Sequence, residues 1–106
     1  REFRLKILAE DFRAAGTAVL DSLAEYAKEQ PGWSIAPDNC EGVRVNLDKA
    51  HGDGWFLLRL SLHDPILPLN IESDREHGAR TIARELAPFL AQQTEIDASS
   101  ALEFTL

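Results

Sequence analysis

The chain has 106 residues, of which 44% are hydrophobic, and this is enough for one domain with a sizeable core. Its 18 acidic residues outnumber the 11 basic ones, and the resulting net charge of −7 disfavours nonspecific binding to nucleic acid or to an anionic membrane. The single cysteine, Cys40, excludes an internal disulfide, and no stretch has the length and apolarity of a membrane span or a leader. We therefore expect a cytoplasmic domain with no nucleic-acid or membrane partner, in which Cys40 is a buried or half-buried side chain.

The first third of the chain predicts a strand followed by a helix. Over residues 3–7 apolar side chains alternate with charged ones, as in a half-buried strand. Over 11–30 apolar residues recur at steps of three and four, which places them on one helical stripe. Asp11 is a suitable N-cap, Gly16 weakens the helix slightly, and Pro31 ends it.

The middle of the chain predicts short strands. Residues 33–35 and 43–47 are the first two, and 55–61 is the third. The connection 49–54 has the glycine and Asp-Gly content of a hairpin, so strand 43–47 should pair antiparallel with strand 55–61. We expect His51 to be an ordinary loop residue.

A second hairpin follows, in which strand 55–61 turns through Ser-Leu-His-Asp-Pro into strand 66–72. Because side chains alternate with period two, Arg59 and Ser61 should point to the same side of their strand. Pro68 cannot donate a hydrogen bond to a neighbouring strand, which predicts that strand 66–72 is an edge strand or is locally irregular.

The last third predicts a second helix that begins at Ser73 or Asp74, with Pro88 making its last turn irregular or splitting it. Its apolar stripe consists of Ala79, Ile82, Ala83, Leu86, Phe89 and Leu90. Residues 94–106 lose this periodicity. They are either a loose tail or a segment that returns to pair with the sheet through Leu102, Phe104 and Leu106, so we divide the chain into a domain over 1–93 and a C-terminal tail over 94–106.

The order strand, helix, four strands, helix predicts an α+β fold. We expect a mainly antiparallel sheet of four to five strands with two helices on one face. The other face, which bears Arg44, Trp55 and Arg59, would be left for a cleft or another domain.

The polar turn between the last two strands is where the sequence points to chemistry. Arg59 offers a guanidinium fork, Ser61 a hydroxyl and His63 an imidazole, and this combination can bind phosphate. The alternative is an exposed arginine beside ordinary turn residues. The Ser-x-His-Asp string does not predict a hydrolase, because adjacent turn residues point apart. We expect no catalytic residue and no metal ligand in the chain.

The run from Asp53 to Ser73, DGWFLLRLSLHDPILPLNIES, resembles the C-terminal domain of the α-D-phosphohexomutases, the phosphomannomutase/phosphoglucomutase family. Members carry DGW-x-x-x-R-x-S-(N or G)-T-(E or similar)-P, followed by a strand that ends in a segment like Leu-Asn-Val-Glu-Ser. Upstream, Glu41-Gly42-Val43-Arg44-Val45 is similar to the family's D-G-(I/V)-(R/K)-(V/F) strand. The resemblance implies a TATA-binding-protein-like architecture.

By this resemblance, Arg59 and Ser61 fall on the family's phosphate-binding arginine and serine, and Pro65 on its closing proline. Leu62 stands where the family has Asn or Gly. His63 stands where the family has Thr, and it can donate to a phosphate in place of that residue. The resemblance thus implies a substrate phosphate site formed by Arg59, Ser61 and His63.

The family interconverts hexose 1-phosphate and hexose 6-phosphate through an enzyme phosphoserine on another domain, beside a magnesium ion. Neither the serine loop nor the Asp-rich metal loop occurs in these 106 residues. The resemblance therefore implies a phosphate-binding domain that is inactive alone and has no cofactor of its own, with magnesium needed by the full-length enzyme. Its partners would be the phosphosugar substrate and the other domains of the same polypeptide. The alternative is a stand-alone α+β module that binds a ligand or regulates, without catalysis.

Overall fold

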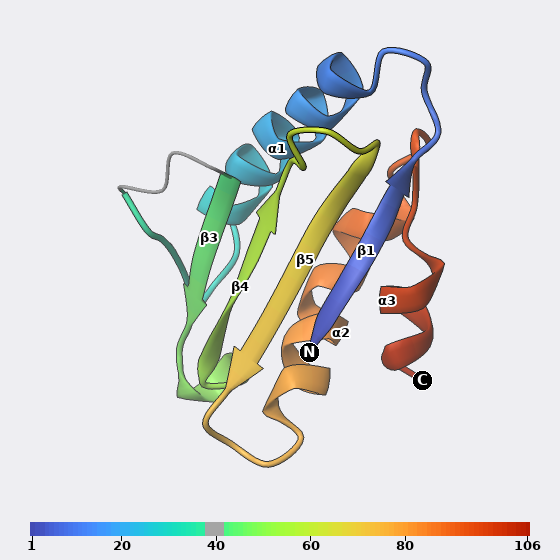
Figure 1. Cartoon of the computed structure of the whole chain (residues 1–106). Helices are drawn as coiled ribbons and strands as arrows, with labels where there is room; N and C mark the ends of the chain where they lie inside the picture. Colours follow the sequence, from blue (N-terminus) through green and yellow to red (C-terminus); the bar gives the residue numbers. More distant parts are fainter. Residues whose placement is uncertain (38–41) are drawn as a thin grey trace.

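A six-stranded antiparallel sheet, in the order β2-β3-β4-β5-β1-β6, forms one layer of the structure, and the helices form the other (Figure 1). The computed structural model describes residues 1–37 and 42–106, so Cys40 lies outside the described residues. The elements are β1 (Glu2–Ile7), α1 (Phe12–Lys28), β2 (Trp33–Ile35), β3 (Gly42–Leu47), the 3-10 helix η1 (Lys49–His51), β4 (Gly54–Arg59), β5 (Ile66–Ser73), α2 (Gly78–Ala91), β6 (Ile96–Asp97) and α3 (Ser99–Phe104). No helix within the described ranges combines the length and the apolarity needed to cross a membrane.

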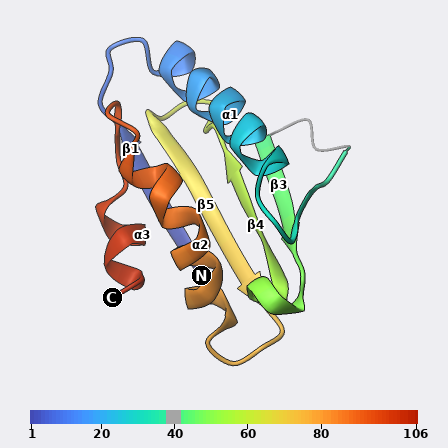
Figure 2. The same ribbon diagram turned by 180° about the vertical axis from the view of Figure 1, so that it is seen from behind.

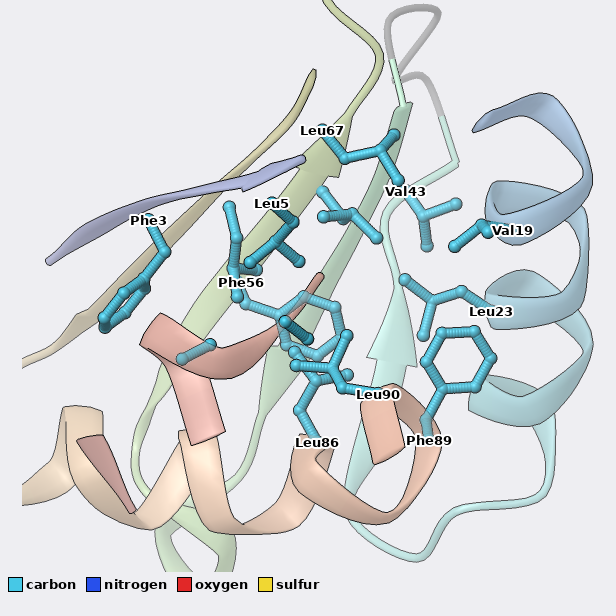
Figure 3. Packing of buried hydrophobic residues seen from close by; sticks show 14 of the residues in the cluster. Phe3, Leu5, Val19, Leu23, Val43, Phe56, Leu67, Leu86, Phe89 and Leu90 are labelled. Carbon is cyan, nitrogen blue, oxygen red and sulfur yellow. The ribbon is translucent and has the colours of Figure 1, made fainter. Parts of the chain in front are cut away.

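The core lies between the sheet and the helices, which cover one face of the sheet (Figure 2). Every second residue of the strands points into it, and Phe56, Leu58 and Leu69 are fully buried. Leu23 from α1 and Leu86 from α2 meet these side chains from the other layer (Figure 3). The stripes predicted for both helices supply much of this core, because burial of an apolar stripe is what holds such helices to a sheet.

The α+β class, the antiparallel sheet and the pairing of β3 with β4 are confirmed. The predicted numbers of strands and helices are wrong, since the described residues form six strands and three α-helices. The additional elements, β6 and α3, are two and six residues long, which is too short for a periodic pattern to be recognised. The TATA-binding-protein-like detail stays a prediction.

The segment after residue 93 returns to the sheet. Ile96 pairs with Ile7 of β1, and α3 then packs against α2 and β1. The ring of Phe104 lies 5.4 Å from that of Phe3. Phe104 and its neighbours Leu102 and Leu106 form no strand, so the pairing predicted through them is wrong, and the segment docks through a helix instead.

Two arginines of α2 hold the end of α3. Arg80 Nε donates to the carbonyl oxygen of Phe104 at 3.0 Å, and Arg84 Nε donates to that of Thr105 at 2.9 Å. The last carbonyls of a helix have no partner within the helix, and cationic donors there satisfy both the hydrogen bond and the helix dipole.

β5 is not an edge strand, so that one of its two predicted alternatives is wrong. It lies between β4 and β1, in the middle of the sheet, and Pro68 faces Arg4 of β1. Ile71 N bonds to the Arg1 carbonyl beside β1, so by alternation the nitrogen of Pro68 points toward β4. The last β4–β5 pair is that of Leu58 with Leu69, so the missing N–H falls just beyond it, opposite Arg59 at the end of β4.

The second helix begins later than predicted, at Gly78 instead of Ser73 or Asp74. Ser73 is the last residue of β5, and its hydroxyl donates to the Gly52 carbonyl oxygen at 2.5 Å while accepting from Arg75 N at 3.1 Å. The side chain that could have capped a helix is therefore used to join β5 to the turn before β4. Pro88 does not split α2, which continues to Ala91.

His51 is more than a loop residue. It lies in η1, and its Nδ1 is 3.0 Å from Glu85 Oε1 of α2. The same oxygen accepts from Trp33 Nε1 of β2 at 3.1 Å. One carboxylate thus links three segments that lie far apart in the sequence.

The opposite face of the sheet carries mixed polar and apolar side chains. Arg44 lies over Trp55, with 4.3 Å between the guanidinium carbon and the ring centroid, a cation–π contact. Glu2, Arg4 and Lys6 of β1 are exposed on this face. That a cleft or another domain uses this face stays a prediction.

The buried and open faces of β4 can be compared through adjacent leucines. Leu58 is fully buried under the helices, whereas Leu57 is half-buried on the open face. We expect Leu58→Ala to lower the free energy of unfolding by about 2–5 kcal/mol, and Leu57→Ala by about 1 kcal/mol. Urea denaturation of both variants checks this, and equal losses would contradict the assignment of the faces.

A pH-dependent contribution to stability is expected from Asp97, the last residue of β6. Its carboxylate accepts from Ser99 N at 3.0 Å, and this bond, the Ser99 side chain and the attraction of Lys6 lower the pKa of Asp97. Because the folded-state pKa of Asp97 is lower than the unfolded value of 3.8, its ionised carboxylate stabilises the folded protein at pH values above 3.8. This stabilisation is lost as the pH falls through the folded-state pKa.

We therefore expect Asp97→Ala to lower the melting temperature at neutral pH. The difference in melting temperature from the unsubstituted protein should disappear under acid conditions. Thermal melts across this pH range measure it. A gap that stays constant in acid would show that the charge of Asp97 contributes nothing.

Candidate phosphate-binding site

The corner, residues 60–65, joins β4 to β5 at the end of the sheet opposite η1 (Figure 1). Two backbone hydrogen bonds close it: Ser61 N donates to the Ile66 carbonyl oxygen at 3.1 Å, and Ile66 N donates to that of Asp64 at 2.7 Å. The path of the corner is therefore set by main-chain bonds and not by the side chains at its tip.

Neighbouring elements hold the corner from two sides. Ile7 N at the end of β1 donates to the Pro65 carbonyl oxygen at 2.7 Å. On the other side, Arg13 Nη2 of α1 donates to the Leu62 carbonyl oxygen at 2.9 Å. The corner is thus tied to the sheet and to a helix.

A pocket of about 500 Å³ opens between α1, the start of β3 and the end of β4 with its corner. Arg59 and Ser61 line it, so the structure brings together two of the three residues singled out in the sequence. Arg13, Thr17 and Asp21 line it from α1.

The third residue singled out, His63, is exposed at the tip of the corner and is not among the residues that line the pocket. Its neighbour Leu62 does line the pocket, although 69% of its surface is exposed. His63 is therefore in reach of a ligand only at the outer rim of the corner.

Two glycines permit the close approaches that shape this pocket. A Cβ atom added to Gly16 of α1 would lie 2.7 Å from Leu60 Cδ1, so the glycine lets the helix settle onto the corner. Gly42 faces Arg59 across the β3–β4 pair, and an added Cβ would lie 2.7 Å from Arg59 Cα and would also collide with the Leu58 carbonyl oxygen. Gly16 lowers the helix propensity of α1 slightly, but only a residue without a Cβ atom allows this packing.

The charges at the pocket favour an anion. Among the described residues, two basic ones, Arg13 and Arg59, and one acidic one, Asp21, line the pocket, in a chain whose net charge is −7. Arg59 makes no ion pair or side-chain hydrogen bond with any residue in the described ranges, and Arg13 uses one of its five N–H donors on the corner. A guanidinium fork beside the Ser61 hydroxyl matches the geometry of a phosphate or carboxylate group.

Across residues 1–37 and 42–106, no three His, Cys, Asp or Glu side chains are grouped so that they could hold a metal ion. The described part of the pocket is suited to bind and orient an anion through its arginines. It offers no nucleophile activated by a neighbouring base.

The α1 residues of the pocket were not predicted from the sequence. Arg13, Thr17 and Asp21 follow one another at i, i+4 and i+8, which places them in a row beside the apolar stripe of the helix. This spacing is visible in the sequence. The packing of the corner over this row is a tertiary contact, which a local sequence pattern does not predict.

The close approach at Gly42 gives a test of how Arg59 is positioned. Gly42→Ala should push β3 away from β4 beside Arg59 and lower the free energy of unfolding by about 1–3 kcal/mol. Asn46→Ala, at an exposed position of the same strand, is the control. Denaturation and the NMR signal of the Arg59 amide measure the effect, and two equally stable variants with unchanged Arg59 signals would contradict it.

No protein-family model matches the chain. A probable phosphoglucosamine mutase from Methanopyrus kandleri is 34% identical to it over 58 residues, which cover 55% of this chain and 12% of that protein. The chain thus matches only about an eighth of the length of this relative. The match supports the resemblance to the phosphohexomutases at the level of the superfamily: this chain is similar to part of a mutase of that kind.

Proposed function

We propose that this chain is the substrate-phosphate-binding C-terminal domain of a phosphohexomutase, an enzyme that interconverts hexose 1-phosphate and hexose 6-phosphate. The observation that carries the proposal is that Arg59 and Ser61, two residues apart at the end of β4, line one pocket beside a corner held by backbone hydrogen bonds. The similarity to part of a phosphoglucosamine mutase supports it.

The phosphate would be held mainly by Arg59 and Ser61. A charge-assisted fork from the guanidinium and a further bond from the hydroxyl fix both the position and the orientation of a phosphate group. His63, exposed at the rim of the corner, would add a donor from outside the pocket. The net charge of −7 requires this attraction to be local, and the two arginines of the pocket provide it.

In this role the chain would anchor the phosphate that does not react. As in the family that the chain resembles, the phosphoserine and the magnesium ion would lie in other domains of a longer polypeptide, and no group of described residues is suited to hold a metal. This chain would have no mutase activity of its own. Its contribution would be to keep the sugar bound while the reacting end is exchanged.

A stand-alone module that binds a ligand without catalysis is the second candidate, since residues of this chain alone form a pocket of about 500 Å³. The length of the native gene product separates the two. A chain several times longer, with this segment at its end, favours the mutase.

The test of the proposal is Arg59→Ala in the longer polypeptide that contains this domain. Losing a forked pair of charge-assisted bonds should lower kcat/KM for a hexose phosphate by about a hundred- to ten-thousandfold, because such bonds contribute about 1.5–3 kcal/mol each. The melting temperature should change little, since Arg59 is only half-buried, at the last position of β4.

Arg4→Ala is the matched control, because Arg4 is exposed on β1 away from the pocket. Arg44 would be a poorer control, since it stacks on Trp55. Similar small effects of the Arg59 and Arg4 substitutions would mean that Arg59 is an ordinary surface residue.

A further inference from the structure

A further pocket, of about 400 Å³, lies at the end of the sheet away from the corner. It opens between the start of β1, the end of β5, the start of α2 and the end of α3 (Figure 1). β5 spans the distance from the corner to this pocket, and its eight residues extend over about 25 Å. Three arginines, Arg1, Arg75 and Arg80, line the pocket together with Phe104.

The carboxylates around this pocket are fewer or are turned elsewhere. Glu72 is the one acidic residue within the described ranges that lines it, and its Oε1 lies 3.5 Å from the terminal ammonium of Arg1. Asp74 lines a different pocket, beside Trp55. Glu76 lies 3.6 Å from His77 and does not line the pocket. An excess of positive charge is therefore gathered here, in a chain whose net charge is −7.

The three guanidinium groups are held in place by uncharged groups. Arg80 Nε donates to the Phe104 carbonyl oxygen at 3.0 Å, and Arg75 Nη1 donates to that of Lys49 at 2.8 Å. Arg1 lies over the ring of Phe104, with 4.4 Å between its guanidinium carbon and the ring centroid. A guanidinium group has five N–H donors, so Arg75 and Arg80 each keep most of theirs for a ligand. The arginines are thus positioned before a ligand binds, and no carboxylate among the described residues forms an ion pair with their side chains.

The ring of Phe104 brings two of these cations together. The guanidinium carbon of Arg80 lies 5.1 Å from the same ring centroid, so it can be no farther from that of Arg1 than these two distances combined. Two like charges at this range repel each other, and an anion that contacts both would turn the repulsion into attraction. Guanidinium groups bind phosphate and carboxylate oxygens through paired hydrogen bonds.

We propose that this pocket binds a small polyanion, a molecule that carries two or more phosphate or carboxylate groups, through Arg1, Arg75 and Arg80. The inference goes beyond the proposed function, because the pocket uses no residue of the corner. Its ligand links the start of β1, the connection between β5 and α2, and α2 itself. Since Arg1 and Arg80 both contact Phe104, the bound polyanion also stabilises the docked position of α3.

The experiment is an NMR titration of the 106-residue chain with pyrophosphate and, separately, with citrate, at millimolar concentrations and constant pH. The amino terminus is acetylated, so that the terminal ammonium adds no charge. At least one of the two ligands should shift the amide signals of residues 71–80 and of Phe104, and the tighter one identifies the class of anion. Sodium chloride at the same ionic strength is the control for general screening. Shifts no larger than those in chloride would overturn the inference.

Arg80→Gln removes one cation of the pocket but keeps an N–H donor for the Phe104 carbonyl. It should weaken binding of the polyanion by about ten- to a hundredfold, because charge-assisted bonds are lost. Arg84→Gln is the matched control: Arg84 lies on the same helix and donates to the Thr105 carbonyl oxygen at 2.9 Å, but it does not line the pocket. Equal losses in the two variants would show that the net charge or the docking of α3 is responsible, and would overturn the site.

Thermal melts give a second measurement that does not depend on assigned signals. A ligand that binds only the folded chain raises its melting temperature. The polyanion should therefore raise the melting temperature of the unsubstituted chain and of Arg84→Gln, and it should raise that of Arg80→Gln much less. An equal rise in all three would contradict a site that contains Arg80.

Arg59→Ala separates this inference from the proposed function. Arg59 lies at the corner end of the sheet, so its loss should leave the shifts of residues 71–80 unchanged. If the polyanion shifts these residues but Arg59→Ala has no effect on mutase activity in the longer polypeptide, this inference stands and the proposed function falls. If Arg59→Ala lowers that activity and residues 71–80 do not respond, the proposed function stands and this inference falls.

Discussion

Leu58 of β4 and Leu69 of β5 face each other across the antiparallel pair, and both are fully buried beneath the helices. Because side chains alternate with period two, this pair fixes the side on which every other residue of the two strands lies. A slip of one residue would carry Arg59 into the core and Leu58 into solvent, at a cost that no other contact of the corner could offset. The position of Arg59 therefore depends on the burial of its neighbour, and the site is a consequence of the register.

The elements that the sequence predicts well are those whose local pattern is also their pattern of burial. The stripes of α1 and α2 and the alternation of β1 are buried as expected, since each extends over several turns or pleats. The errors have specific causes. Pro68 indicated an edge strand or a local irregularity, yet β5 is central, and Pro68 lies just beyond the last β4–β5 pair. Ser73 indicated a helix start, yet its hydroxyl is bound to Gly52. Both outcomes depend on partners from other segments, which override local preference.

The candidate site likewise contains residues that local pattern predicts and residues whose position depends on tertiary packing. That Arg59 and Ser61 share one side follows from alternation, and both line the pocket. His63 could not be placed in this way, because turn residues have no fixed period, and it lies at the exposed tip. The contribution of α1 required knowledge of where the corner packs, which depends on the contact between Gly16 and Leu60. A residue that lowers helix propensity is thus the one that brings the helix to the site.

The tip of the corner departs from the pattern of the family that the chain resembles, while the backbone hydrogen bonds that shape the corner are in place. Leu62 stands in the place of Asn or Gly and is 69% exposed, while the bonds that shape the corner involve backbone atoms and Arg13. Side chains at the tip can therefore change while the backbone keeps its path. In the proposed role, the affinity for phosphate would reside in Arg59 and Ser61, and the substitution at Leu62 would alter what lies beyond the phosphate. A leucine there favours an apolar contact with the rest of the ligand over a further hydrogen bond to its charged group.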